Sequence, residues 1–541
     1  MSKPSYAEVY RAFRWTEALG ALGWDATSDV NLGHTIVDRH PPDRVALHWI
    51  GKAGAGARYS FGDLARLSNR FANVLRAHGI SRGDRVAGYL PRIPETVIAM
   101  LGTWKAGAIW VPVFTGFSGE AIEFRVRHSG AKVLCTHWEY RARIPRAAAG
   151  RAKVVTVAAS DGTGVDHDDL SFWPATNAQA EIFVPARCRR EEPAVLLYTS
   201  GSTGPPKGVK IATNFLVAVY PYMRYAVDLR PDDVFWPTGD PGWGYGLVCY
   251  MGAMALGVAV ISQEAQPVPE FCLSLLSARD VSNFATTPTV LRGIMALGQD
   301  AVGRSPVRVR CVNSVGEPLN AEVVHFFRRV WDVTPMDQYG ASEVGLPIGN
   351  FNALDMVVKP GSMGLVVPGF EMAVVDEAGT ALGPDEVGHV ALRPSAEGYY
   401  SLGYWEDPER TRETYRTWIT IGDLARRDAD GYFWFEGRAD DVIKSAGYRI
   451  GPFEIESTIL RHPAVAEAAV VGKPDPLRGQ IVKAYVVLRP SVVPRSGLEE
   501  EIVDLVRTEL GRHLAPREVE VVDQLPKTET GKIQRFLLRT R

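Results

Sequence analysis

The sequence predicts an α/β protein that has a large N-terminal domain and a small C-terminal α+β domain. The chain contains 541 residues, more than a single hydrophobic core usually serves, so two or three domains are expected. As far as residue 350, short apolar runs alternate with segments of helical periodicity, which is typical of parallel-rich sheets flanked by helices. After about residue 355, short strands joined by Gly and Asp turns indicate a β-rich subdomain.

The N-terminal region supplies the alternating elements in order. Residues 61–80 have apolar side chains at helical spacing, and Gly79 is placed to end that helix. A turn and a strand are expected over residues 81–92, and a helix followed by a buried strand over residues 94–113. Two further apolar strands are expected at residues 194–200 and 307–316.

The remainder of the chain begins with short strands and ends with a mixed pattern. Strands are expected at residues 370–379, 388–394 and 431–437. The pattern then predicts a helix and two strands over residues 453–488, and an amphipathic helix over residues 498–511. A charged, glycine-containing stretch near Arg438–Asp440 separates the two parts, which predicts domains at residues 1–438 and 439–541.

Composition argues against several classes of protein. Apolar residues make up 46% of the chain and charged residues 23%, and the formal net charge of -2 gives no global attraction to nucleic acid or anionic membranes. The five cysteines are scattered without a CxxC pair, so buried free thiols are expected rather than disulfides or a zinc site. The N-terminus has no apolar signal core, and the apolar stretches at 101–117 and 248–261 are too short or too broken by glycine to span a bilayer. We therefore expect a cytoplasmic enzyme.

The strongest local signal is the sequence YTSGSTGPPKGVK, at Tyr198–Lys210. It follows an apolar strand, and a helix is expected after it. Glycines let backbone N–H groups close around an anion, hydroxyls donate further hydrogen bonds, and Lys207 supplies charge. The pattern predicts a phosphate-binding loop. It is not the loop of a P-loop kinase or ATPase, because Lys207 is followed by Gly208 and Val209.

This loop resembles the signature of the adenylate-forming superfamily, which includes acyl-CoA synthetases, peptide-synthetase adenylation domains and luciferases. Four more segments resemble motifs of that family in the same order: an adenine-binding turn, a second nucleotide motif, a ribose motif with a hinge, and a lysine loop. They are Asn313–Asn320, Met336–Gly345, Ile421–Glu456 and Leu525–Arg535. The resemblance is to acyl-CoA synthetases of the acetyl-CoA synthetase-like branch, and it implies that the small C-terminal domain is mobile.

The resemblance implies a set of ATP-binding residues. Asp423 would accept hydrogen bonds from the ribose hydroxyls, although Ile421 replaces the Thr that usually precedes this Gly-Asp pair. Arg438 would bind ribose or the α-phosphate, Arg449 would bind phosphate or coenzyme A, and Tyr339 would stack on adenine. The other nucleotide-binding positions that the resemblance implies are Thr199, Ser200, Gly201, Ser202, Thr203, Gly204, Lys207, Gly316, Glu317, Pro318, Asp337, Gln338, Gly340, Ala341 and Ser342.

Three residues are implied to be catalytic: Lys532, Glu343 and Thr199. Lys532 would offset the negative charge that develops as the carboxylate attacks phosphorus and pyrophosphate leaves. Glu343 would bind a Mg²⁺ ion that bridges the ATP phosphates, since a hard cation prefers oxygen ligands. Taken alone, a lysine near a chain end is ordinarily solvated and a glutamate is ordinarily a surface residue, so both roles depend on the ordered motifs.

The implied chemistry has two half-reactions, formation of an acyl-adenylate and transfer of the acyl group to coenzyme A. Lys532 must leave before the thiol can attack, and the family achieves this by rotating the small domain about a hinge. Asp440 matches the hinge position. Gly447, preceded by Ala446, matches a glycine that lets pantetheine pass close to the backbone. The implied substrates are a carboxylic acid, ATP and coenzyme A, with Mg²⁺ as cofactor.

Five positions are implied to line the acyl pocket: Trp243, Gly244, Tyr245, Val315 and Gly340. Acetate enzymes have a bulky Trp at the position of Gly340, so its absence predicts an open volume. We therefore expect an acid larger than acetate, such as a short branched, medium-chain or small ring acid. Each buried methylene contributes only about 0.8 kcal/mol, so the preference for chain length should be broad.

Two other functions remain open from the sequence. A related ligase could load the acyl group onto a carrier protein, although the chain has no appended carrier domain after the Lys532 loop. A non-catalytic acyl-adenylate sensor is the second alternative, and it would not need both Glu343 and Lys532. The sequence does not predict the identity of the acid, the oligomeric state, or regulation by acylation of Lys532.

Overall fold

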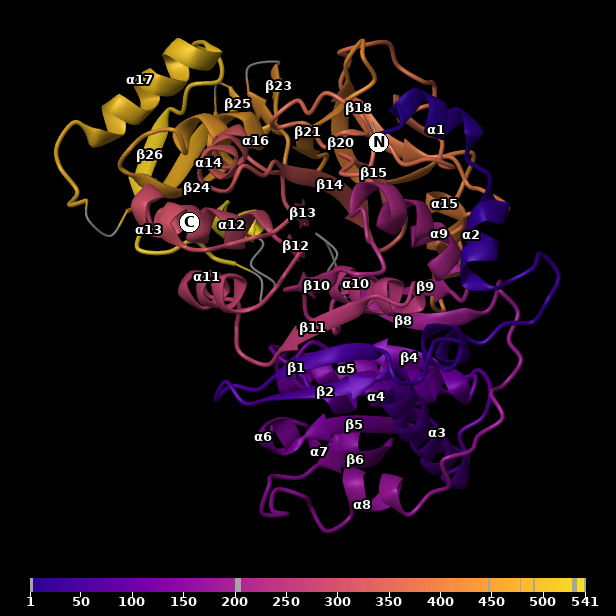
Figure 1. The fold of residues 1–541 in the computed structure, drawn as a ribbon. Coiled ribbons are helices and arrows are strands. Elements are labelled where there is room, and N and C mark those ends of the chain that lie inside the picture. The colour runs from indigo at the N-terminus through magenta and orange to yellow at the C-terminus, as the bar shows by residue number, and fades with distance from the viewer. Residues whose placement is uncertain are drawn as a thin grey trace.

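The computed structural model describes residues 3–199, 206–445, 448–476, 478–489, 492–527 and 533–539. Two large sheets with helices packed against them form most of the molecule, and a small antiparallel sheet and a C-terminal α+β unit complete it (Figure 1). The chain starts beside an edge of one large sheet, because the Tyr6 hydroxyl donates a hydrogen bond to the main-chain oxygen of Val366 in the edge strand β16 (Leu365–Val366).

The nine-stranded sheet is parallel at its centre and antiparallel at its edges. Its order is β16-β15-β14-β13-β12-β10-β11-β1-β2, and only the pairings that involve β2, β15 and β16 are antiparallel. The strands are β1 (Val45–Ile50), β2 (Gly56–Ser60), β10 (Val234–Pro237), β11 (Ala259–Gln263), β12 (Asn283–Thr286), β13 (Cys311–Val315), β14 (Pro335–Ala341), β15 (Gly345–Gly349) and β16 (Leu365–Val366).

The eight-stranded sheet has the same mixed character. Its order is β19-β9-β8-β4-β3-β5-β6-β7, and β9 is antiparallel to both of its neighbours. The strands are β3 (Arg85–Tyr89), β4 (Ile109–Pro112), β5 (Val133–His137), β6 (Lys153–Val157), β7 (Leu170–Ser171), β8 (Pro193–Thr199), β9 (Lys207–Ala212) and β19 (Ser401–Tyr404). The two sheets confirm the predicted parallel-rich α/β architecture.

Helices connect and cover these strands, and α3 shows how the sequence sets one of them. The Ser60 hydroxyl and the Asp63 carboxylate form a reciprocal capping box at its start, and it ends at Ala77, ahead of Gly79 at a φ of +77°. The helices of the N-terminal part are α1 (Tyr6–Ala12), α2 (Trp15–Leu22), α3 (Phe61–Ala77), α4 (Pro94–Lys105), α5 (Gly119–Ser129), α6 (Trp138–Arg141), α7 (Arg146–Ala149), α8 (Phe172–Asn177), α9 (Phe215–Pro221), α10 (Gly244–Ala255), α11 (Pro269–Ala278), α12 (Pro288–Ala296), α13 (Gln299–Arg304), α14 (Ala321–Trp331) and α15 (Pro408–Thr414), with two π-helical turns η1 (His34–Asp38) and η2 (Tyr222–Ala226).

One predicted element is wrong. The sequence analysis expected a helix after the phosphate-binding loop, but the loop leads into β9, which runs antiparallel to β8. Val209 and Ile211 are buried and Lys210 between them is not, and this alternation is the period of a strand. The next helix, α9, begins only at Phe215. The loop therefore joins the two strands of a hairpin, unlike the strand-to-helix turn of a P-loop.

A four-stranded antiparallel sheet confirms the predicted β-rich subdomain. Its order is β17-β18-β20-β21, and the strands are β17 (Met372–Val375), β18 (Gly388–Leu392), β20 (Ile419–Arg427) and β21 (Phe433–Arg438). Its strands lie beside the C-terminal unit in Figure 1, and its last strand ends two residues before the proposed hinge at Asp440.

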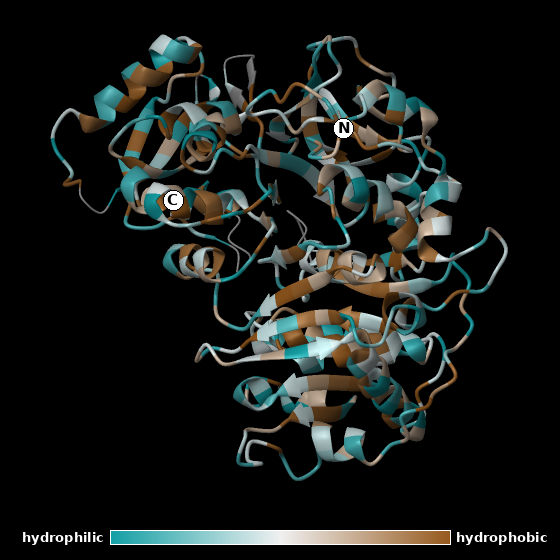
Figure 2. Cartoon of the chain, in the orientation of Figure 1, coloured by the Kyte–Doolittle hydropathy of each residue, from teal (hydrophilic) through white to brown (hydrophobic). Residues whose placement is uncertain are grey.

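The C-terminal unit has its own sheet and its own apolar core. It contains β22 (Ile443–Ser445), β23 (Tyr448–Ile450), α16 (Pro452–Ile459), β24 (Val465–Asp475), β25 (Gly479–Leu488), α17 (Leu498–Leu510), β26 (Glu518–Val521) and α18 (Arg535–Leu538). Ile455, Ile459 and Ile502 are fully buried in this core. Figure 2 shows hydrophilic and hydrophobic residues alternating along α17, as the sequence predicts. The division of the chain at residues 438 and 439 stays a prediction.

Burial explains two features of the sequence. All five cysteines are free and buried, as expected. The apolar stretches belong to interior elements such as α4 and α10, which lie in the largest core. Across the described residues, none of the helices has both the length and the apolar character that crossing a membrane requires.

Candidate active site

A cavity of about 1520 Å³ lies where the two large sheets, the antiparallel sheet and the C-terminal unit meet. Among the residues that line it are most of those singled out in the sequence analysis: Thr199, Lys207, Trp243, Gly244, Tyr245, Val315, Gly316, Glu317, Pro318, Asp337, Gln338, Tyr339, Gly340, Ala341, Ser342, Glu343, Asp423 and Arg438. Residues 239 positions apart in the sequence, such as Thr199 and Arg438, therefore line one space.

Some of the expected residues are not in this set. Ser200, Gly201, Ser202, Thr203, Gly204, Ala446, Gly447 and Lys532 lie outside the described residues. The side chain of Arg449 also lies outside them, although its backbone belongs to β23. Asp440 does not line the cavity, but its Oδ1 accepts a hydrogen bond from Arg438 Nε at 3.1 Å. Lys527, Ile533 and Arg535, on either side of Lys532, do line the cavity.

The base of the cavity is formed at the carboxyl ends of β13 and β14, where ligands of parallel sheets are usually bound. Val315 at the end of β13 pairs with Gln338 of β14. Gly316 then adopts a φ of +103°, and a Cβ atom on it would lie 3.1 Å from the Trp243 ring. Glycine is therefore required there both by the backbone conformation and by the close indole.

Asp337 brings a carboxyl group into this base with one oxygen unpaired. Its Oδ2 accepts a hydrogen bond from the main-chain N–H of Leu319 at 3.1 Å. Its Oδ1 is buried and, among the described residues, has no hydrogen-bond partner. Burial raises the pKa of this carboxyl to about 8. A ligand N–H that reached Oδ1 would satisfy a buried acceptor and favour the ionised form.

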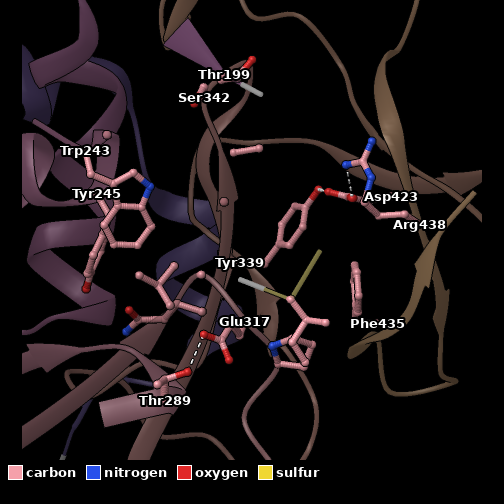
Figure 3. A pocket seen from close by; sticks show the side chains of 18 of the residues that line it. Thr199, Trp243, Tyr245, Thr289, Glu317, Tyr339, Ser342, Asp423, Phe435 and Arg438 are labelled. Carbon is pink, nitrogen blue, oxygen red and sulfur yellow. Dashed lines mark hydrogen bonds and ion pairs between the residues drawn. The ribbon is translucent and has the colours of Figure 1, made fainter. Parts of the chain in front are cut away.

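Tyr339, Asp423 and Arg438 form a hydrogen-bonded chain on another wall (Figure 3). The Tyr339 hydroxyl donates to Asp423 Oδ2 at 2.6 Å, and Arg438 Nη1 donates to Asp423 Oδ1 at 3.0 Å. The pairing of β20 with β21 places Asp423 directly opposite Arg438. These two donors orient the carboxylate.

Glu343 lies near the phosphate-loop hairpin and is partly buried. Burial raises the pKa of its carboxyl, and Tyr404 donates a hydrogen bond to its Oε1 at 3.1 Å. A buried carboxylate is costly without a counter-charge, which a divalent cation would supply. The described residues contain no cluster of three or more His, Cys, Asp or Glu that could hold a metal. A magnesium ion held by one carboxylate and by ligand phosphates fits this arrangement, and Thr199 and Lys207 line the same space.

Aromatic and apolar side chains form the part of the cavity opposite the Tyr339–Asp423–Arg438 chain (Figure 3). The rings of Trp243 and Tyr245 meet edge to face with centroids 5.9 Å apart. A buried polar network lies behind them: the Tyr245 and Tyr222 hydroxyls are 3.1 Å apart, Tyr222 donates to Gln338 Oε1 at 2.5 Å, and Gln338 Nε2 donates to Asn313 Oδ1 at 2.8 Å. Tyr222 has no motif around it, and sequence reasoning missed it.

The structure corrects the interpretation of Gly340. A Cβ atom on this residue would lie 2.4 Å from the main-chain oxygen of Gly345 and 2.5 Å from Leu346 Cδ2. The missing side chain therefore leaves no empty volume in its own direction, because Leu346 occupies that space and itself lines the cavity. Leu346 was not singled out from the sequence, since a leucine in an apolar strand carries no distinctive signal.

Glu317 is engaged by neighbouring side chains rather than left free for a ligand. Thr289 Oγ1 donates to its Oε1 at 2.7 Å (Figure 3), and Arg292 Nη2 donates to its Oε2 at 2.6 Å. The Glu317 side chain thus fixes the turn, and Glu317 lines the cavity together with Gly316 and Pro318. Sequence reasoning assigned the backbone of this turn to the ligand but did not find Thr289 or Arg292.

Comparisons with known proteins find relatives that match nearly the whole chain. The model of the AMP-binding enzyme family matches residues 34–405, and that of the AMP-binding enzyme C-terminal domain matches residues 454–532. The acetyl-coenzyme A synthetase of Bacillus subtilis (strain 168) is 37% identical, with 99% of this chain and 94% of the relative covered. The structure of a Brucella canis acyl-CoA synthetase is similar, with a TM-score of 0.80 and 39% sequence identity. The match covers 99% of this chain and 98% of the Brucella canis chain. An anthranilate CoA ligase in complex with anthranoyl-AMP has a TM-score of 0.88 at 28% identity, with 98% of each chain covered.

Proposed function

The chain belongs to the family of AMP-binding enzymes and is an AMP-forming acid–thiol ligase, and we propose that the cavity activates a carboxylic acid larger than acetate. The enzyme uses ATP, Mg²⁺ and coenzyme A. The observation that supports this assignment best is the convergence of Lys207, Glu343 and the Tyr339–Asp423–Arg438 chain on one cavity, next to an aromatic and apolar space.

The reaction has two steps, adenylation of the acid and transfer of the acyl group to coenzyme A. A carboxylate oxygen of the acid attacks the α-phosphorus of ATP, and the bond to the β-phosphate oxygen breaks, which gives an acyl-adenylate and pyrophosphate. The deprotonated thiol of coenzyme A then attacks the acyl carbon, and AMP leaves with the electrons of the former C–O bond. Activation is needed because oxide is a poor leaving group, whereas AMP is a good one.

We assign the base of the cavity to the nucleoside. The Oδ1 of Asp337, which has no hydrogen-bond partner among the described residues, would accept a hydrogen bond from the exocyclic amine of adenine. Asp423 would accept hydrogen bonds from the ribose hydroxyls, in the orientation set by Tyr339 and Arg438. Stacking on the Tyr339 ring is compatible with this geometry, since its hydroxyl is held by Asp423.

The phosphates are assigned to the hairpin loop and the residues beside it. Thr199 and Lys207, at the two ends of the loop, would donate hydrogen bonds to phosphate oxygens. Glu343 would hold the magnesium ion, which would neutralise phosphate charge when bound. Lys532 is proposed to reach the acyl carboxylate and the α-phosphate, and the cavity-lining positions of Lys527, Ile533 and Arg535 place its flanking segments at this site. Asp440 is proposed as the hinge, and Gly447 and Ala446 as the pantetheine passage.

The acid is assigned to the space that Trp243, Tyr245, Val315 and Leu346 bound. Support for an acid larger than acetate comes from a structural relative that is named as an anthranilate CoA ligase. Acetate is the competing acid, because the Bacillus subtilis relative is named as an acetyl-CoA synthetase. Leu346 sets the limit on size in this proposal, since it fills the space next to Gly340.

A panel of carboxylic acids tests the function directly. Coenzyme A-dependent release of AMP is expected with an acid of more than two carbons as the best substrate by kcat/KM. Acid-dependent exchange between ATP and pyrophosphate is expected in the wild type and should be lost in Lys532→Ala. A higher kcat/KM for acetate than for every larger acid would refute the pocket assignment. Release of AMP that required a carrier protein instead of coenzyme A would refute the assigned thiol.

A further inference from the structure

Tyr404, at the end of β19, touches two residues of the proposed phosphate site. Its hydroxyl donates to Glu343 Oε1 at 3.1 Å. Lys207 Nζ lies 5.9 Å from the centroid of its ring, within the range in which a cation is attracted to a ring face. The contact with the hairpin is continuous in the backbone as well, because Tyr404 pairs with Val209 of β9. One tyrosine therefore joins the hairpin to the buried carboxylate.

The main chain of Glu343 is fixed separately from its carboxylate. The Ser401 hydroxyl donates to the main-chain oxygen of Glu343 and lies 2.7 Å from the Tyr415 hydroxyl. Tyr404 is the only side chain among the described residues whose hydrogen bond to the Glu343 carboxylate is seen. The backbone position and the carboxylate orientation of Glu343 thus depend on different residues of the same strand, and they can be perturbed one at a time.

We propose that Tyr404 is a positioning residue: its O–H holds Oε1 of Glu343 so that the carboxylate presents its other oxygen to the divalent cation that accompanies ATP. The inference rests on the proposed function, which assigns the metal to Glu343. A carboxylate without such a hydrogen-bond donor can rotate about its terminal C–C bond. A donor that binds one carboxylate oxygen prevents this rotation and so orients the other oxygen toward the metal. The phenol suits the task because it is neutral and does not compete with the cation for the carboxylate charge.

A packing role and a positioning role for Tyr404 predict different effects on ATP binding. A buried aromatic that only packs in the core would affect the stability of the fold, and the binding of ATP with and without metal would change together. A residue that orients the metal ligand affects only the part of ATP binding that depends on the metal. The ratio of the ATP dissociation constants without and with a divalent cation isolates that part, because it is the coupling between the two ligands.

The experiment is calorimetric titration of ATP into the full-length enzyme in the absence of acid, first without divalent cation and then with Mn²⁺ at a fixed concentration. We expect Mn²⁺ to tighten ATP binding to the wild type. In Tyr404→Phe this tightening should fall by about tenfold, while the dissociation constant for metal-free ATP stays within about twofold. Tyr415→Phe is the matched control: it removes a hydroxyl from the same cluster without touching the carboxylate, and the tightening should persist.

The outcomes separate this proposal from the proposed function. A tightening in Tyr404→Phe equal to that of the wild type, or an equal loss in both ATP measurements, overturns the role of Tyr404. Glu343→Gln should abolish the tightening; if it does not, the metal assignment fails independently of Tyr404. The concentration of Mg²⁺ that half-saturates ATP–pyrophosphate exchange provides a second measurement. It should rise about tenfold in Tyr404→Phe, with kcat at saturating Mg²⁺ little changed.

Discussion

Truncation of Leu346 to alanine should shift the enzyme toward longer acids. The Leu346 side chain is 7% exposed and lines the cavity next to Gly340, where its Cδ2 occupies the direction that a side chain at 340 would take. Leu346→Ala removes three carbon atoms from this wall. The main chain of β15 pairs with strands on both sides, so we expect the space to persist rather than collapse.

The size of the shift follows from the carbon atoms removed. Each methylene of a longer acid that refills the space contributes about 0.8 kcal/mol, which is about fourfold in kcat/KM. Two additional methylenes should therefore shift the ratio of kcat/KM between a longer and a shorter acid by about 15-fold, and three by up to about 60-fold. The free energy of unfolding should fall by about 2–5 kcal/mol, as for other buried leucines.

The assay is coenzyme A-dependent AMP release over a series of straight-chain acids, with kcat/KM measured for each. Leu392→Ala is the matched control, because Leu392 in β18 is also 7% exposed but does not line the cavity. It should lower stability and leave the order of the acids unchanged. The reasoning is refuted if Leu346→Ala changes the ratio by less than twofold, or if the two variants change it alike.

Two further predictions concern the base of the cavity. The folded-state pKa of Asp337 is raised to about 8 from an ordinary value of 3.8, so the stability of the wild type should fall as pH rises through this interval. The melting temperature of Asp337→Asn should therefore increase relative to that of the wild type between about pH 5 and 8.5. A difference in melting temperature that does not change with pH across this range would contradict the buried charge. Gly340→Ala places a Cβ atom 2.4 Å from the main-chain oxygen of Gly345 and should lower the free energy of unfolding by about 1–3 kcal/mol, measured by urea unfolding, whereas Gly20→Ala, with open space around its Cβ within helix α2, should raise it by up to about 1 kcal/mol.

The sequence predicts the large-scale architecture because periodicity and turn residues are local signals. The parallel-rich sheets, the β-rich subdomain and the C-terminal α+β unit all follow from such patterns. The strand β9 was missed because glycines and a lysine around it suggested a loop leading to a helix. The alternation of apolar Val209 and Ile211 with the charged Lys210 is visible in the sequence and could have predicted the strand.

The site was predictable only where its residues belong to motifs. Glu343 and Asp423 occur in ordered motifs, whereas Tyr404 lies 61 positions from Glu343 and meets it only through the fold. The error at Gly340 has a related cause. A missing side chain suggests empty space, but the direction of the absent Cβ and the neighbour that fills it, Leu346, depend on backbone coordinates.

The chain of hydrogen bonds behind the aromatic wall has a consequence for changing the enzyme's substrate. Hydrogen bonds link Tyr245, Tyr222, Gln338 and Asn313 in order, and each residue determines whether its neighbour donates or accepts. Replacing one of them would reverse the direction of a neighbouring hydrogen bond or leave a buried polar atom without a partner. This side of the binding space is a rigid template that accepts few substitutions. Laboratory evolution toward new acids should therefore accumulate its successful changes at the aliphatic residues that line the cavity, Val315 and Leu346.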